Sequence, residues 1–230
     1  MSELASKTEL LRRLGKLVRG LAALFWGLPL ALLVYVITGS SDFFYALGFF
    51  AVVPPFLASA LLLYGLAQLG HFQKQERIWV DTLDRAKLFG LVNLGLSPFL
   101  FWWHRFPYEK VYQAALLLLA ASSLIFIFIL NRVLDRLAAM LPDETLRLET
   151  RLFTSFNRRV LLTIPILIVV YFALEFFPPL PYLLQSIIVH LQPQSLWIIL
   201  FLVLMPLAMT MALIWKIKEV VFSSILETDR

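Results

Sequence analysis

Long apolar stretches alternate with short segments rich in charged residues along the whole chain of 230 residues. A helix needs about 20 mostly apolar residues to cross the hydrocarbon core of a bilayer. Stretches that approach this length cover residues 20–38, 43–69, 88–103, 111–130, 160–177 and 196–215. These runs are continuous and lack the alternation of barrel strands. We therefore expect an all-α polytopic membrane bundle of six transmembrane helices, forming a single domain over residues 1–230.

The basic residues are strongly biased toward one side of this topology. Eighteen of the 20 Lys and Arg residues fall on the side of the N-terminus, and only Arg105 and Lys110 fall on the other. Because basic residues concentrate in cytoplasmic loops, we expect both termini in the cytoplasm. The arginine-rich inner segments favour a bacterial inner membrane. The first apolar run is long and no A-x-A-like site follows it, so we expect an uncleaved anchor.

The charged segments between the spans also carry a helical pattern. Residues 76–87 place Trp79 and Leu83 on one side, and residues 144–159 repeat this with leucine and phenylalanine. Helices with one apolar and one charged face lie in the plane of the membrane interface. We therefore predict amphipathic interfacial helices on the cytoplasmic side, although the same faces could dock a partner. A similar pattern predicts a short outer interfacial helix over residues 182–191.

Prolines interrupt five of the six predicted spans and predict helix kinks, because proline removes a backbone donor and clashes with the preceding turn. The positions are Pro29, Pro54, Pro55, Pro98, Pro165 and Pro206. Kinked helices can surround a transport site, but they also occur in bent, tightly packed bundles. Small residues at helical spacing, such as Gly20 and Gly27, allow close helix packing and fit both interpretations.

A short motif precedes each outward-running span and leaves open a weak threefold repeat of helical hairpins. The motif is a basic residue followed by two apolar ones, as in Lys16-Leu17-Val18, Lys87-Leu88-Phe89 and Arg151-Leu152-Phe153. Each of the three following helices carries a proline. The alternative is that every inner membrane boundary has this composition of a basic residue followed by aliphatic ones.

Polar groups inside the spans are scarce. Glu175 is the only carboxylate within a predicted span, and it lies near the outer end. With the neutral residues Asn93 and Ser97 it forms the set of candidate transport residues, because ionisable groups within spans mark ion pathways. The alternative is that Glu175 reaches the interface and that the neutral groups bond backbone carbonyls.

Candidate ligands for a metal or haem are equally few. The chain has no cysteine, which excludes thiolate and Cys-zinc chemistry. His104 and His190 both lie on the outer side and are the weak metal candidates, but interface polarity explains them as well. No Ser–His–Asp arrangement, H-E-x-x-H motif or phosphate loop occurs. The sequence therefore indicates no catalytic residue and predicts no cofactor.

These observations leave three classes of function. A non-enzymatic structural, assembly or interaction subunit of a larger membrane complex is favoured, because site chemistry is missing. The alternatives are a small transporter or channel built from proline-kinked helices and, third, a cofactor-binding or lipid-acting membrane enzyme. The expected partners are membrane lipids, including anionic headgroups on the cytoplasmic side, and other membrane chains or copies of the protein itself. The basic residues mix with acids beside the span ends, so we expect no nucleic-acid binding.

Overall fold

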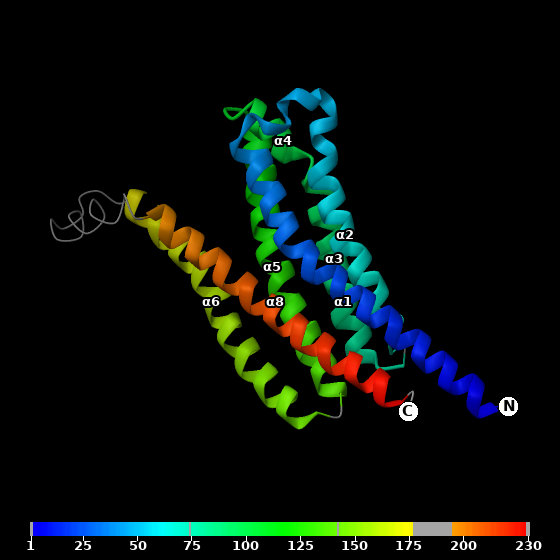
Figure 1. The fold of residues 1–230 in the computed structure, drawn as a ribbon. Coiled ribbons are helices and arrows are strands. Elements are labelled where there is room, and N and C mark those ends of the chain that lie inside the picture. Colours follow the sequence, from blue (N-terminus) through cyan, green and yellow to red (C-terminus); the bar gives the residue numbers. More distant parts are fainter. Residues whose placement is uncertain (1, 74, 142, 177–194, 229–230) are drawn as a thin grey trace.

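The computed structural model describes residues 2–73, 75–141, 143–176 and 195–228, and almost all of this part is helical (Figure 1). In chain order the elements are α1 (Ser2–Ser40), η1 (Asp42–Val52), α2 (Val53–Leu69), α3 (Arg77–Leu96), α4 (Phe99–Arg105), α5 (Lys110–Met140), α6 (Glu144–Phe176) and α8 (Ser195–Thr228). No strand occurs in the described ranges. The all-helical class expected from the sequence is confirmed.

Four helical segments are long and apolar enough to cross a membrane. They are Leu11–Ser40, Ala46–Leu69, Lys110–Met140 and Phe201–Ser223. These lengths and compositions are those of an integral membrane protein. Within the described residues, these segments match the first, second, fourth and sixth spans expected from the sequence. The six-span count therefore stays a prediction.

The expected third span is divided in the structure. α3 ends at Leu96, and the seven-residue helix α4 begins at Phe99, with Pro98 as its N-cap residue. Neither helix alone meets the length and composition of a span, because α3 begins with a charged stretch and α4 is short. The expected fifth span is the last part of α6, as far as Phe176.

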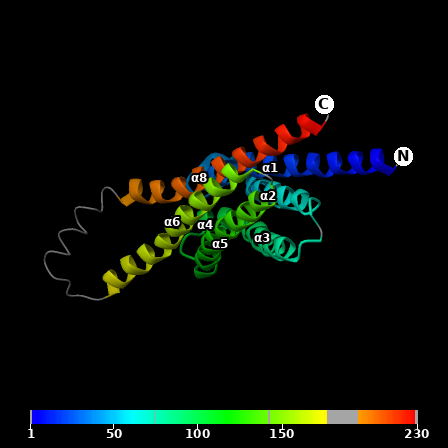
Figure 2. The same cartoon turned by 90° about the horizontal axis from the view of Figure 1, so that it is seen from below.

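The most extensive helix contacts join α1 to α2 and α3 to α5. α8 lies more extensively against α1 than against α6, and α6 lies more extensively against α5 than against α8. Both termini lie at the same end of the molecule (Figure 1). Seen from below, the end of α6 and the start of α8 leave the group formed by α1 to α5 in the direction opposite to the start of α1 (Figure 2). The threefold repeat of helical hairpins therefore stays a prediction.

Two glycines allow the close approach of α1 and α2. A Cβ atom on Gly20 would lie 2.8 Å from the carbonyl oxygen of Gly65 and would overlap the side chain of Leu69. A Cβ atom on Gly65 would lie 3.1 Å from the carbonyl oxygen of Gly20. The two backbones therefore touch, as small residues permit in membrane helices. The chain reaches α2 through η1, where Gly48 has φ +55°, a conformation that favours glycine.

The core extends beyond the apolar spans toward the end that carries the termini. Trp79 and Leu83 of α3 are 0% and 2% exposed and pack in one apolar cluster with Leu17 of α1 and Leu137 of α5. The interpretation of residues 76–87 as a separate interfacial helix therefore differs from the structure, in which they are the first part of α3. Their apolar face covers protein, because α1 and α5 extend beside it.

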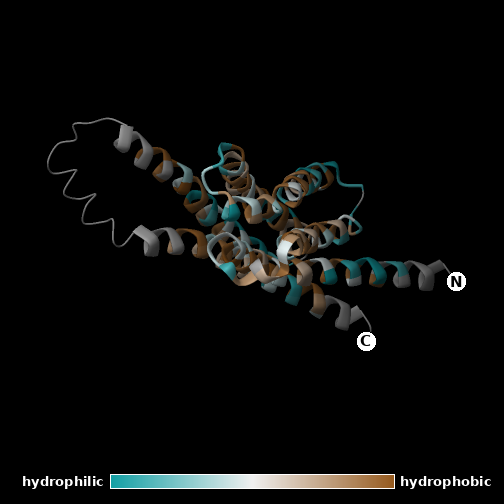
Figure 3. Cartoon of the chain, turned by 90° about the horizontal axis from the view of Figure 1, so that it is seen from above, coloured by the Kyte–Doolittle hydropathy of each residue, from teal (hydrophilic) through white to brown (hydrophobic). Residues whose placement is uncertain are grey.

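The segment 144–159 likewise forms the beginning of α6, and no break separates it from the apolar part of that helix. Here the apolar stripe is exposed, with Leu148 and Leu152 at 64% and 73%. The predicted outer helix over residues 182–191 lies outside the described residues. Polar residues are prominent in the first half of α1 and near the connection between α2 and α3 (Figure 3).

The prolines occupy two kinds of position. Pro54 and Pro55 lie in the first turn of α2, where a missing backbone donor breaks no helical hydrogen bond. Pro29, Pro165 and Pro206 lie inside α1, α6 and α8. Figure 1 shows α1 changing direction along its course.

Candidate functional site

The candidate transport residues on α3 bond to neighbouring groups within the bundle. Asn93 and Ser97 are 5% and 0% exposed. The Ser122 hydroxyl of α5 donates to Asn93 Oδ1, and the Ser97 hydroxyl donates to the Leu94 carbonyl at 2.9 Å. Glu175 lies one residue before the end of α6, and its side chain lies outside the described part. Asn93 therefore joins α3 to α5, and the described structure does not bring the three residues into one site.

The outer histidines give no described metal site. His104, at the end of α4, places Nε2 2.9 Å from Asp42 Oδ1 at the start of η1. His190 lies outside the described residues. Within the described ranges, no group of three or more His, Asp or Glu side chains could hold a metal ion. The contact with Asp42 links the end of α4 to the start of η1.

A buried polar cluster joins α5, α6 and α8. Asn131 and Asn157 are 4% and 0% exposed, and Thr210 is 0% exposed. The Asn157 amide nitrogen lies 3.1 Å from Asn131 Oδ1, 3.1 Å from Thr210 Oγ1 and 3.2 Å from the Pro206 carbonyl. Asn131 in turn donates to Thr210 Oγ1 at 3.0 Å. These bonds fix three helices to one another, because alternative partners are scarce in an apolar surrounding.

The sequence did not single out this cluster. Asn131 and Asn157 fall just outside the expected spans, where Arg132 and Arg158 mark the membrane boundaries. The spacing of 26 residues across the α5–α6 turn gives no local signal. The turn itself is fixed by Asp143, whose Oδ1 accepts the Leu146 amide at 3.1 Å as an N-cap does.

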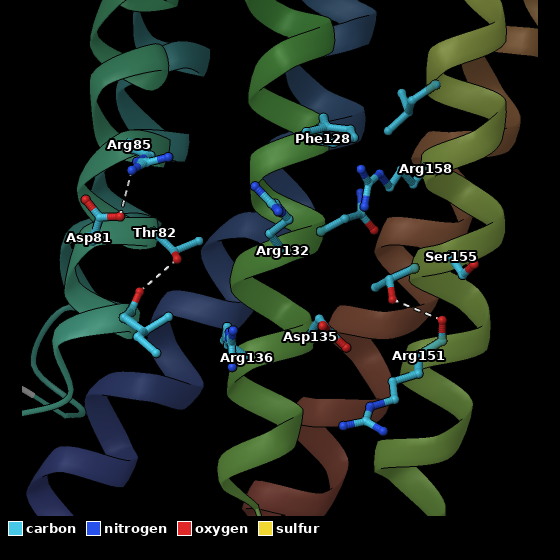
Figure 4. A pocket seen from close by; sticks show the side chains of 14 residues that line it. Asp81, Thr82, Arg85, Phe128, Arg132, Asp135, Arg136, Arg151, Ser155 and Arg158 are labelled. Atoms are coloured by element: carbon cyan, nitrogen blue, oxygen red, sulfur yellow. Dashed lines mark hydrogen bonds and ion pairs between the residues drawn. The ribbon is translucent and has the colours of Figure 1, made fainter.

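A basic cavity lies beside this cluster, between α3, α5 and α6, with a volume of about 470 Å³. Its charged lining consists of five arginines and two aspartates, on α3 Arg85 and Asp81, on α5 Arg132, Arg136 and Asp135, and on α6 Arg151 and Arg158. Figure 4 shows these side chains around the gaps that flank α5. The charged lining carries a formal charge of +3.

Few of these charges are paired with one another. Arg85 forms an ion pair with Asp81 at 2.9 Å on α3. No other ion pair between lining side chains occurs in the described part of the chain. The guanidinium carbons of Arg132 and Arg158 lie 5.9 and 5.4 Å from the ring centre of Phe128, within cation–π range. The aromatic ring thus holds two arginines from different helices near each other.

Helical spacing explains how the cavity forms. Arg132 and Arg136 are four residues apart on α5, and Arg151 and Arg158 are seven apart on α6, so each pair shares a helix face. The α5–α6 turn brings these two faces together. In the sequence these arginines indicate the topology of the chain, and their convergence with Arg85 depends on the packing of three separate segments.

The chemistry of the cavity is that of an anion site. Guanidinium groups present parallel N–H donors that match the geometry of phosphate and carboxylate groups. A cleft with one sign of charge and apolar walls also concentrates oppositely charged groups. The side chains lining the cavity include neither a histidine nor a cysteine.

Comparisons with known proteins add no relative. No family model matches the chain, and neither a curated protein nor a solved structure shows significant similarity to it.

Proposed function

We propose that this chain is a non-enzymatic, six-span membrane protein that acts as an interaction subunit of a membrane complex and holds an acidic group of a partner in its basic cavity. The observation that carries the proposal is the convergence of five arginines from three helices on one cavity of about 470 Å³. A single ion pair within the lining leaves most of this charge available to a ligand.

The six-span topology completes the proposal. α3 and α4 together supply one further span and the last part of α6 supplies another, in addition to the four long apolar segments. The charge bias supports an orientation in which both termini and the basic cavity lie on the cytoplasmic side, where the leaflet carries anionic lipids. A bacterial inner membrane fits the arginine-rich inner segments.

A transporter or channel has less support. Most polar side chains inside the described spans bond to each other or to backbone carbonyls, as Asn93 does with Ser122 and Ser59 with Tyr35. The cavity is lined by residues 78–85 of α3, 128–136 of α5 and 151–161 of α6, and these stretches lie toward the end of the bundle that carries the termini (Figure 1). An interaction surface at the membrane boundary needs no polar path between the two sides.

Topology is tested by labelling single cysteines in intact cells with an impermeant thiol reagent. A cysteine at Ser40, which is exposed at the end of α1, should react from outside, and one at Thr145, at the start of α6, should react only after the cells are opened. External labelling at Thr145 would reverse the orientation and remove the basic cavity from the cytoplasm.

The interaction is tested by purifying the full chain in a gentle detergent and identifying every protein and lipid that remains bound. The double variant Arg132→Gln/Arg158→Gln should lose an acidic component that the wild type retains. Arg159→Gln is the matched control, because Arg159 is an exposed neighbour of Arg158 that does not line the cavity. Identical bound components in all three proteins would defeat the proposal.

A further inference from the structure

An apolar groove continues the basic cavity along α3 and α5. Its volume is about 530 Å³, and its lining residues are Phe89, Val92, Gly95, Leu96, Leu118, Ala121, Ser122 and Ile125. None of these side chains carries a charge. The groove lies between the same two helices that form one wall of the cavity.

The register of both helices places cavity and groove on one continuous face. On α3 the cavity residues Thr82 and Arg85 are followed by the groove residues Phe89, Val92 and Leu96, at successive spacings of three or four. Residues at these spacings share a helix face.

The same register holds on α5, which runs in the opposite direction. The groove residues Leu118, Ala121 and Ile125 lead to the cavity residues Phe128 and Arg132, again in steps of three or four. The arginines of the basic cavity therefore lie at one end of this helix face, and the face is apolar from Phe89 onward.

Small side chains leave open space in the groove, and its surface stays apolar. A Cβ atom placed on Gly95 would have no neighbour within 4 Å, so the space beside it is open. Ala121 adds only a methyl group to the opposite wall. Ser122 donates its hydroxyl to the buried Asn93 Oδ1, which directs its polar atom into the helix pair.

The combined length of the basic cavity and the apolar groove matches the thickness of one membrane leaflet. Arg85 and Leu96 are separated by 11 residues, or about 16 Å along α3 at about 1.5 Å per residue. Half of a hydrocarbon core of about 30 Å is about 15 Å. An acyl chain that begins at the level of Arg85 would therefore end near the bilayer midplane.

We propose that the basic cavity and the apolar groove form one site for a single anionic phospholipid of the cytoplasmic leaflet. Its phosphate binds Arg132 and Arg158, and one acyl chain lies in the groove between α3 and α5. This inference rests on the proposed anion-binding role of the cavity and names the partner. A headgroup without an ammonium suits the site, because the five arginines and two aspartates of the lining carry a net positive charge.

Native mass spectrometry of the full chain in a nonionic detergent tests the site. The protein is titrated with phosphatidylglycerol, with phosphatidylcholine of the same acyl chains, and with inorganic phosphate. We expect phosphatidylglycerol to bind as a single copy, in preference to phosphatidylcholine, and inorganic phosphate to compete poorly. The double variant Arg132→Gln/Arg158→Gln should bind phosphatidylglycerol about 25-fold more weakly, at about fivefold per arginine, while Arg159→Gln should not.

A second variant tests the groove independently of the charge. Gly95→Leu should fill the groove and weaken phosphatidylglycerol binding severalfold. Gly15→Leu is the matched control, because a Cβ atom on Gly15 of α1 also meets no neighbour within 4 Å and this residue lies outside the groove. Unchanged melting temperatures would show that both glycine variants fold.

Three results would overturn the phospholipid assignment. Equal binding of the two phospholipids would exclude recognition of the headgroup. If inorganic phosphate competes fully with phosphatidylglycerol and Gly95→Leu has no effect, the cavity binds a small soluble anion. If an acidic protein segment binds in place of lipid and is lost in the arginine double variant, the cavity binds a protein partner. The last two results would leave the proposed anion-binding function in place.

Discussion

The polar cluster between α5, α6 and α8 allows a quantitative test of how the bundle is held together. Asn157→Ala removes an amide whose nitrogen lies within 3.2 Å of acceptors on both other helices. An amide nitrogen carries two hydrogens, so about two of the three contacts are made at once. Interhelical hydrogen bonds in membrane proteins contribute about 0.6 kcal/mol on average and at most about 1.7. We therefore expect the free energy of unfolding to fall by about 1–3 kcal/mol.

A double-mutant cycle isolates the bond between Asn157 and Asn131. The single variants Asn131→Ala and Asn157→Ala and the double variant are unfolded reversibly in detergent or bicelles, and their free energies of unfolding are compared. The coupling energy should be about 0.6–1.7 kcal/mol, because the two side chains lie in direct contact. Thr163→Ala is the control, since its hydroxyl bonds the Arg159 carbonyl of its own helix at 2.9 Å. A coupling energy indistinguishable from zero would refute the role of the cluster.

Three further predictions concern other parts of the bundle. Gly20→Ala should destabilise the protein by about 1–3 kcal/mol through overpacking against α2, whereas Gly15→Ala, with open space around it, should be neutral or stabilising in the same unfolding assay. Pro98→Ala should let α3 continue toward α4 and change the spacing of spin labels at Leu91 and Tyr108, which an unchanged electron-resonance distance would contradict. Glu175→Gln should leave phosphatidylglycerol binding unaltered, and reduced binding in the titration would give this carboxylate a role at the site.

The sequence predicts the helical class well because that class depends on local composition. An apolar run such as residues 111–130 admits few structures in lipid other than a helix. The ends of helices are harder to predict, because charged residues end an apolar run without ending a helix. Trp79 and Leu83 lie in a charged stretch that is continuous with the apolar part of α3, and they pack against α1 and α5.

The candidate site was harder to predict because it depends on contacts between distant segments. The number of arginines on each side of the spans indicates how the chain is oriented in the membrane. Their convergence depends on the three-dimensional structure, in which Arg132 and Arg158 lie over the same Phe128 ring. The groove depends on an absent side chain at Gly95, which no local pattern marks as functional. The Asn131–Asn157 contact likewise joins helices whose register is set by tertiary packing.

The most direct measurement is a cryo-electron microscopy structure of the full chain in nanodiscs that contain phosphatidylglycerol. We expect an elongated density between α3 and α5, with its head beside Arg132 and Arg158 and its tail along Phe89 and Val92. The density should disappear from the Arg132→Gln/Arg158→Gln variant and remain in Arg159→Gln. An empty groove in wild-type protein, with solvent alone in the basic cavity, would contradict the binding of an anionic lipid there.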